Sequence, residues 1–145
     1  MKQIHFYTFC LFISLFFMAG CSRYVPVKGR VTFEDGSPLT RGEVRFQKES
    51  VMGHGKIDSN GFYSIGFGKD KNGIPKGTYD IAIANAIIIA DPPPGVPLAK
   101  IKMPPPTQLI DGKYSSFSES GLKCEVSDAM EYNITVVPPS KKTKQ

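Results

Sequence analysis

The feature of this sequence that most restricts its fold is an alternation of apolar and polar residues with a period of two. It begins near residue 25, where one face is expected to hold Val25, Val27, Gly29, Val31 and Phe33. Successive side chains of a β-strand point to opposite faces, so this period is typical of strands with one buried face. No helical pattern of useful length accompanies it. The alternation therefore predicts an all-β domain.

Six further stretches are expected to be strands, separated by turn-forming residues. In five of them the inward side chains are expected to be Val44 and Phe46, then Tyr63, Ile65 and Phe67, then Tyr79, Ile81 and Ile83, then Leu122, Cys124 and Val126, and last Tyr132, Ile134 and Val136. The sixth, at 52–57, is weaker and is loosened by Gly53 and Gly55. Asn60-Gly61 is a strong hairpin signal. About seven short strands predict one antiparallel β-sandwich with Greek-key-like connections.

The N-terminal residues follow a different pattern. Lys2 and His5 precede an apolar run from Phe6 to Met18, and small residues and Cys21 follow this run. A positive start, an apolar core and a small-residue exit are the three parts of a secretory signal peptide. The run is shorter than the ~20 residues that span a bilayer, which argues against a permanent transmembrane helix. We therefore expect residues 1–20 to be a signal peptide.

The end of this segment, Met18-Ala19-Gly20-Cys21, resembles the bacterial lipobox, whose consensus is Leu-Ala-Gly-Cys. The resemblance implies cleavage between Gly20 and Cys21, a diacylglycerol on the thiol of Cys21 and an acyl chain on its new amine. Two lipid groups suffice for stable membrane anchoring, whereas a single acyl chain gives only marginal binding. Residues 21–24 would then be the lipidated N-terminus and a short tether. The alternative is an ordinary cleaved signal followed by an incidental cysteine.

The remaining cysteines and the net charge point to no further chemistry. Cys10 belongs to the signal and Cys21 would be lipidated, so Cys124 has no partner for an intramolecular disulfide, and its strand spacing predicts a small buried side chain. The formal net charge is +5, but lysines crowd into residues 138–145, which we expect to be a basic disordered tail. No basic stripe or recognition helix accompanies the charge, so no nucleic-acid partner is expected.

Several segments together resemble a known family. They are Val27–Thr32, Asp35–Leu39, Gly42–Phe46, Asp58–Tyr63 and Ile74–Tyr79. In order and spacing they are similar to the carboxypeptidase regulatory-like domain, a transthyretin-like β-sandwich. With Lys113-Tyr114 and Ser120-Gly121-Leu122, the chain is similar to short lipoproteins of planctomycete-type bacteria. The resemblance covers most of residues 25–137. It implies a single transthyretin-like or immunoglobulin-like sandwich that acts as a folding, spacing or binding module without catalytic residues.

Catalytic and metal-binding functions find little support in the sequence. The transthyretin-like fold includes a hydrolase of 5-hydroxyisourate, which uses clustered His and Arg residues and a C-terminal Tyr-Arg-Gly-Ser, whereas this chain keeps only His54 after the signal. A zinc peptidase would need three protein ligands. Asp58–Gly61 and Asp70–Gly73 each resemble the start of a calcium loop but lack the later acidic residue that would close the shell. We expect no enzyme activity and no cofactor beyond the lipid on Cys21.

Two adjoining segments are candidates for a partner surface. The run Ile81–Ala90 has almost no polar residue, so it is either buried on both faces or offers an edge to which a partner adds a strand. The segment 91–107 is rich in proline, which favours an extended excursion. It is expected to be a connecting arm, with a recognition surface as the alternative. The candidate surface comprises Ile87, Ile88, Ile89, Pro93 and Pro105.

Together these expectations describe an exported lipoprotein, held at a cell membrane through Cys21 and facing the periplasm or the cell exterior. Its β-sandwich, residues 25–137, would be a non-catalytic structural or protein-interaction module at the cell envelope, with an envelope protein or a glycan as partner. An accessory carbohydrate-binding module is the alternative. Because the chain has no Trp, stacking on sugars would have to use Tyr24, Tyr114 or Tyr132.

Overall fold

The computed structural model describes residues 24–67, 73–92, 94 and 102–140, and these ranges are mostly β. The strands are β1 (Tyr24–Val25), β2 (Val27–Phe33), β3 (Glu43–Lys48), β4 (Val51–Lys56), β5 (Phe62–Ile65), β6 (Ile74–Pro75), β7 (Gly77–Ala84), β8 (Ile87–Ile88), β9 (Thr107–Gln108), β10 (Leu122–Val126), β11 (Met130–Glu131) and β12 (Ile134–Val136). A short 3-10 helix, η3, spans Gly112–Ser115. No helix in the described ranges is long and apolar enough to cross a membrane.

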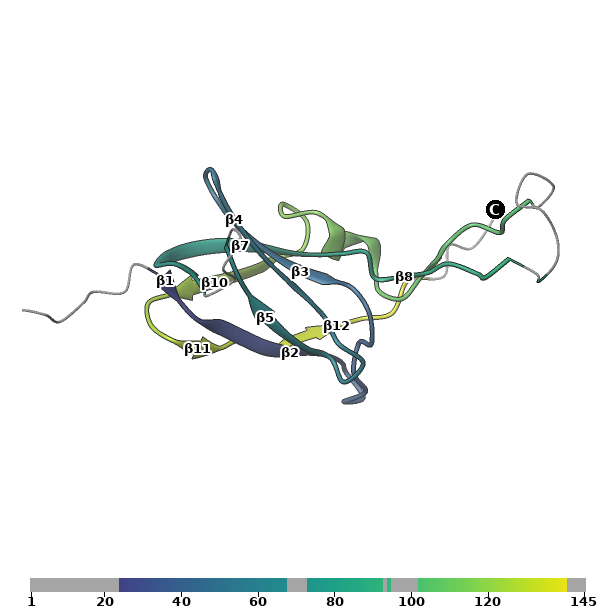
Figure 1. The fold of residues 1–145 in the computed structure, drawn as a ribbon, viewed down its shortest axis with the longest axis horizontal. Coiled ribbons are helices and arrows are strands. Elements are labelled where there is room, and N and C mark those ends of the chain that lie inside the picture. The colour runs from purple at the N-terminus through teal and green to yellow at the C-terminus, as the bar shows by residue number, and fades with distance from the viewer. Residues whose placement is uncertain (1–23, 68–72, 93, 95–101, 141–145) are drawn as a thin grey trace, which may run out of the picture.

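Two four-stranded sheets contain most of the pairing. The first has the order β10-β7-β3-β4 and is antiparallel throughout. In the second, β2 pairs with β5 on one side and with β11 and β12 on the other. In Figure 1, β7 and β10 lie above β2, β11 and β12. Seven of the strands described have three or more residues, in agreement with the number expected from the alternation.

One part of the predicted topology is wrong, because the sheets are not antiparallel throughout. Strands β11 and β12 run parallel to β2, with Met130 opposite Val27 and Ile134 opposite Val31. The chain leaves β10 in the first sheet and enters β11 in the second. Because this connection crosses between sheets instead of closing a hairpin, it does not impose an antiparallel return. Alternation within a strand carries no information about the direction of its neighbour.

The inward side chains of both sheets form one core. Its largest fully buried members are Tyr79, Phe46, Leu39, Ile65, Ile74, Ile81, Ile83 and Ile134. The ring of Phe46 lies 6.0 Å from that of Tyr79 and 6.3 Å from that of Tyr132, at tilted and edge-on angles that favour aromatic pairs. Cys124 is buried in this core, as its strand spacing predicts.

The two glycines of β4 have a different role from the one predicted. Strand β4 is regular and pairs with β3 over its whole length, so Gly53 and Gly55 do not loosen it. Both face inward, where a Cβ on Gly55 would collide with the carbonyl of Ser64. The absent side chains allow β4 to approach the second sheet, and His54 and Gly66 exchange backbone hydrogen bonds of 3.0 and 3.1 Å there. These glycines close one side of the core.

The turn that joins β4 to β5 has the predicted form. The N–H of Gly61 donates to the carbonyl of Asp58 at 3.0 Å, and Gly61 has a φ of 85°. The Asp58 carboxylate accepts from the N–H groups of Asn60 and Phe62. The inward face predicted for the strand after this turn is wrong at Phe67. Tyr63 and Ile65 are buried, but Phe67 is exposed. Strand β5 ends at Ile65, so the alternation no longer applies at Phe67.

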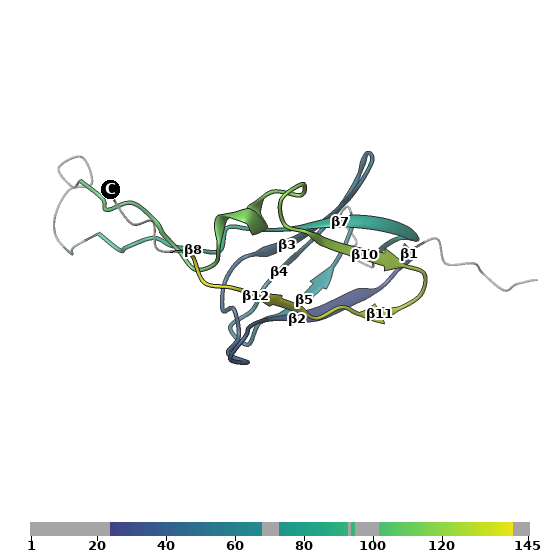
Figure 2. The same ribbon diagram turned by 180° about the vertical axis from the view of Figure 1, so that it is seen from behind.

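The described parts of the proline-rich segment project from one end of the molecule. Strand β1 lies at the opposite end of the long axis, as Figures 1 and 2 both show. Strands β8 and β9 pair at the base of this projection, and residues 88–92, 94 and 102–108 are all exposed. We call residues 87–92, 94 and 102–108 the arm.

Candidate functional site

The predicted partner surface lies at the base of the arm. Ile87 pairs with Gln108 and Ile88 with Thr107, which makes a two-stranded ribbon separate from both larger sheets. Ile88 is 47% exposed and Ile89 is 58% exposed. Exposed branched aliphatic side chains in succession are unusual on a surface that contacts only water. Within the run 81–90, Ile81–Ile83 and Ala86 are buried, Ala84 and Ile87 are partly buried, and the side chains from Ile88 onward are exposed.

A depression of about 330 Å³ adjoins these isoleucines. Its lining consists of Arg41, Gly42, Glu43, Lys56, Asn85, Ile87 and Ile89. Asn85 has a φ of 56°, and this left-handed turn redirects the chain after β7 so that the odd-numbered residues line the depression. The arm base thus combines aliphatic side chains with polar groups from β3 and β4.

Positive charge dominates this depression. The carboxylate of Glu43 forms an ion pair of 3.0 Å with the guanidinium of Arg45, which does not line the depression. Neither Arg41 nor Lys56 has an ion-pair partner within the described ranges. Unpaired cations beside apolar side chains suit a ligand that carries an acidic group next to an apolar one.

The other predicted site residues lie partly within and partly outside the described residues. Pro105 is exposed in the part of the arm that leads to β9. Pro93 lies outside the described residues, as do Gly20, Cys21 and most of the Asp70–Gly73 segment. In the other calcium-like segment, Asp58–Gly61, the Asp58 carboxylate accepts hydrogen bonds from backbone N–H groups of the turn. Turn chemistry therefore accounts for that motif.

A second depression, of about 440 Å³, was not predicted from the sequence. Lys28, Asp58, Phe62, Ser64 and Glu131 are among the residues that line it. Phe62 is 52% exposed, and the guanidinium of Arg30 lies 5.2 Å from its ring centre. The alternation could have indicated this site, because Phe62 must face outward when Tyr63 and Ile65 face inward.

Little in the described structure favours catalysis. No group of three or more His, Cys, Asp or Glu side chains in these ranges could hold a metal ion. His54 is half-buried on β4 opposite Arg45, whose guanidinium bonds to Glu43. Burial raises the pKa of Cys124, whose sulfur lies 3.7 Å from that of Met130. A thiol with a raised pKa is a poor nucleophile near neutral pH.

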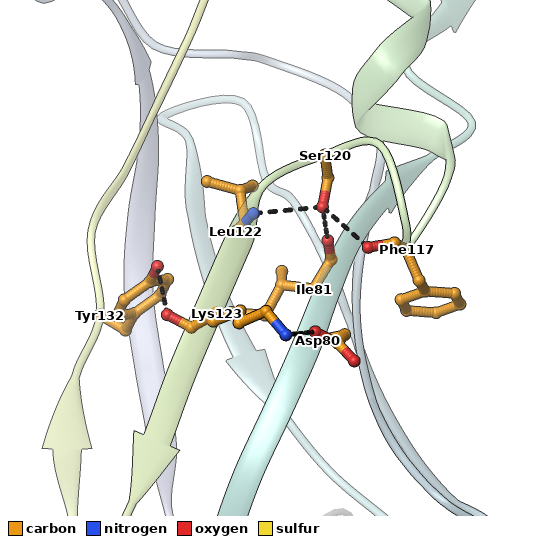
Figure 3. A network of polar contacts seen from close by, with 7 residues as sticks. All are labelled: Asp80, Ile81, Phe117, Ser120, Leu122, Lys123 and Tyr132. Carbon is orange, nitrogen blue, oxygen red and sulfur yellow. Dashed lines mark hydrogen bonds and ion pairs between the residues drawn. The ribbon is translucent and has the colours of Figure 1, made fainter.

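The Ser120-Gly121-Leu122 motif proves to be structural (Figure 3). The buried hydroxyl of Ser120 donates to the carbonyl of Ile81 at 2.5 Å and accepts from the N–H of Leu122 at 3.3 Å. Leu122 and Ile81 are the last pair of the β10–β7 ladder. The serine therefore satisfies backbone groups where the chain enters β10.

Of the three tyrosines considered for sugar stacking, only one is substantially exposed. Tyr114 is buried against the core, and Tyr132 is partly buried with its hydroxyl bonded to the carbonyl of Lys123 at 3.1 Å. Tyr24 is exposed but stacks on Phe67. The exposed aromatic ring that lines a depression is instead Phe62.

The chain matches no protein-family model, no curated protein and no solved structure. Inferences about its function therefore come from its own residues. These residues define an exposed aliphatic surface beside unpaired cations, at the end of the molecule opposite β1.

Proposed function

We propose that this protein is a lipoprotein anchored through Cys21 to a bacterial membrane, with its β domain facing the periplasm or the cell exterior. The domain would be a transthyretin-like sandwich of the carboxypeptidase regulatory-like type, acting as a non-catalytic protein-interaction module. The observation that carries this proposal is the placement of β1 and the arm at opposite ends of the long axis (Figures 1 and 2).

The geometry connects the anchor to the interaction surface. Only Ser22 and Arg23 separate Cys21 from β1, and three residue steps reach at most about 10 Å. Lipid on Cys21 would hold the β1 end of the domain close to the bilayer. The arm would then extend away from the membrane, where another protein can reach it.

The chemistry of the arm base favours a protein partner. Fully burying an isoleucine side chain contributes about 1.5–3 kcal/mol, and Ile88 and Ile89 both remain largely exposed. Arg41 and Lys56 add positive charge at the edge of this apolar surface. We therefore expect an envelope protein whose contact segment carries apolar side chains beside an acidic one.

Two measurements test this proposal. Mass spectrometry of the protein extracted from bacterial membranes should show an N-terminal, acylated Cys21, and Cys21→Ala should carry no lipid and keep residues 1–20. In a pull-down from solubilised envelope, Ile88→Lys should lower partner capture about tenfold or more, since 1.4 kcal/mol corresponds to a factor of ten.

The matched control for the pull-down is Met52→Lys. Met52 is 45% exposed, nearly as exposed as Ile88, but lies on β4 outside the arm. Equal capture by Ile88→Lys, Met52→Lys and the unaltered domain would contradict the role of the arm base. Circular dichroism must show that both variants are folded.

The depression beside Phe62 favours a second candidate function, an accessory carbohydrate-binding module. An exposed aromatic ring among hydroxyl, carboxylate and ammonium groups has the character of a sugar-binding surface. Phe62→Ala should then abolish binding of the folded domain to soluble cell-wall glycan in calorimetric titration. A transthyretin-like hydrolase has the least support, because His54 is the one histidine in the described ranges.

A further inference from the structure

A stacked pair of exposed aromatic side chains lies at the end of the molecule that carries β1. The ring centres of Tyr24 and Phe67 are 5.9 Å apart, with an interplanar angle of 18°. Tyr24 is 38% exposed and Phe67 is 37% exposed. The pair joins β1 to the residue that follows the β5 end of the second sheet, and both rings remain outside the core.

The position of this pair follows from strand pairing. Tyr24 lies opposite Pro75 in the β1–β6 ribbon. Phe67 lies two residues after Ile65, which pairs with Val27, the first residue of β2. Both aromatic residues therefore belong to the end of the domain from which the chain leads back to Cys21.

We infer that Tyr24 and Phe67 form a membrane-contact site, whose ligand is the headgroup–acyl boundary of the phospholipid bilayer that holds Cys21. This inference rests on the proposed lipid anchor. Three residue steps limit the distance between Cys21 and Tyr24 to about 10 Å, and lipid chains on Cys21 place that residue at the bilayer surface. The chain length thus brings the aromatic pair to the interface.

The chemistry of the pair suits that location. Aromatic rings concentrate at membrane interfaces, where an apolar body contacts acyl chains and a polar edge contacts headgroups and water. Tyr24 supplies such a polar edge through its hydroxyl, and the stacked Phe67 ring enlarges the apolar surface. The partner is therefore the lipid surface itself.

The consequence is a fixed orientation of the domain. A lipid anchor on a short tether restricts distance but leaves the domain free to tilt. A second contact made by Tyr24 and Phe67 holds the long axis away from the membrane plane, so that the arm is directed outward. Orientation and partner access are then coupled.

The absence of tryptophan from the chain allows a direct test. Phe67→Trp places a single fluorescent reporter in the aromatic pair. Phe62→Trp places one at an exposed site on β5, farther from β1. Phe62 pairs with Arg30, three residues beyond the Val27–Ile65 pair on β2. The lipidated full-length variants are reconstituted into phosphatidylethanolamine–phosphatidylglycerol vesicles with lipids brominated near the headgroup.

The Phe67→Trp emission should shift to shorter wavelength and lose intensity to the brominated lipids, whereas the Phe62→Trp emission should do neither. Tyr24→Trp provides a second reporter if Phe67→Trp fails to fold. Equal emission behaviour at both sites, with Cys21 acylated, would overturn the membrane contact and leave the proposed function intact. An unmodified Cys21 in the membrane-extracted protein would overturn both.

Discussion

The core strand β7 and the arm use similar side chains in opposite environments. Ile81, Ala82 and Ile83 are buried, yet Ile88 and Ile89, a few residues later, are about half exposed. Strand β7 has β3 and β10 as neighbours and the second sheet beneath it, whereas β8 pairs with β9. The difference lies in what surrounds each strand and not in its composition.

Under the proposed function, this comparison links the core to stability and the arm to partner binding. Apolar side chains in the core gain free energy by leaving water during folding. The apolar side chains of the arm remain exposed to water, so they would gain this free energy only by burial against a partner. Changes in the core should therefore alter unfolding, while changes in the arm should alter binding.

The largest effect is expected where backbone meets backbone inside the core. A Cβ on Gly29 would collide with the carbonyl of Tyr132, so Gly29→Ala must separate β2 from the chain beside it. We expect loss of the cooperative unfolding transition in circular dichroism. The control is Gly112→Ala in η3 after the arm, whose Cβ would meet its nearest atom at 3.9 Å. An unchanged transition for Gly29→Ala would contradict this packing.

A matched pair of isoleucines tests the comparison itself. Ile83→Ala removes a fully buried side chain and should lower the free energy of unfolding by about 2–5 kcal/mol. Ile89→Ala removes a side chain that is mostly exposed and should change it by no more than about 0.5 kcal/mol. Urea denaturation measures both. Comparable losses would mean that the arm is part of the folding core.

A smaller effect is expected at the Ser120 hydroxyl. Ser120→Ala leaves the buried carbonyl of Ile81 without its side-chain donor and should cost about 1–3 kcal/mol. Ser118→Ala, which removes an exposed hydroxyl of the same loop, is the control. Thermal denaturation of the two variants should separate them. Coincident melting curves would show that water replaces the serine without cost.

The smallest effect concerns pH, at the junction of arm and core. The backbone N–H of Lys113 holds the pKa of Asp111 below its ordinary value of about 4. A lowered folded-state pKa contributes stability above the unfolded-state pKa, and this stability is lost as pH falls through the folded-state value. Asp111→Asn should therefore lose less stability between pH 7 and strongly acidic conditions. Identical pH profiles for Asp111→Asn and the unaltered protein would contradict the assignment.

The sequence predicted most of the core because one physical rule governs it. Alternation placed Val44, Phe46 and Tyr79 inward, and the turn at Asp58–Gly61 formed as its residues require. Both features depend on local geometry, which neighbouring residues determine. The candidate surface at Ile87–Ile89 was proposed from the sequence because the run 81–90 contains almost no polar residue.

Other features depend on contacts between distant segments. The parallel pairing of β11 and β12 with β2, and the close approach permitted by Gly53 and Gly55, arise only when the two sheets meet. The stack of Tyr24 on Phe67 likewise joins residues far apart in the chain. Alternation carries no information about such contacts, nor about where a strand ends, and the inward prediction for Phe67 is wrong because β5 ends at Ile65.

The orientation of the domain at the membrane is the most direct test of the account. Fluorophores on Thr78→Cys, near the β1–β6 end, and on Pro105→Cys, in the arm, can be compared by energy transfer to acceptor lipids in vesicles, since both positions are exposed and Cys124 is buried. The account predicts strong transfer from position 78 and weak transfer from position 105. Equal transfer from the two positions, or stronger transfer from position 105, would contradict it.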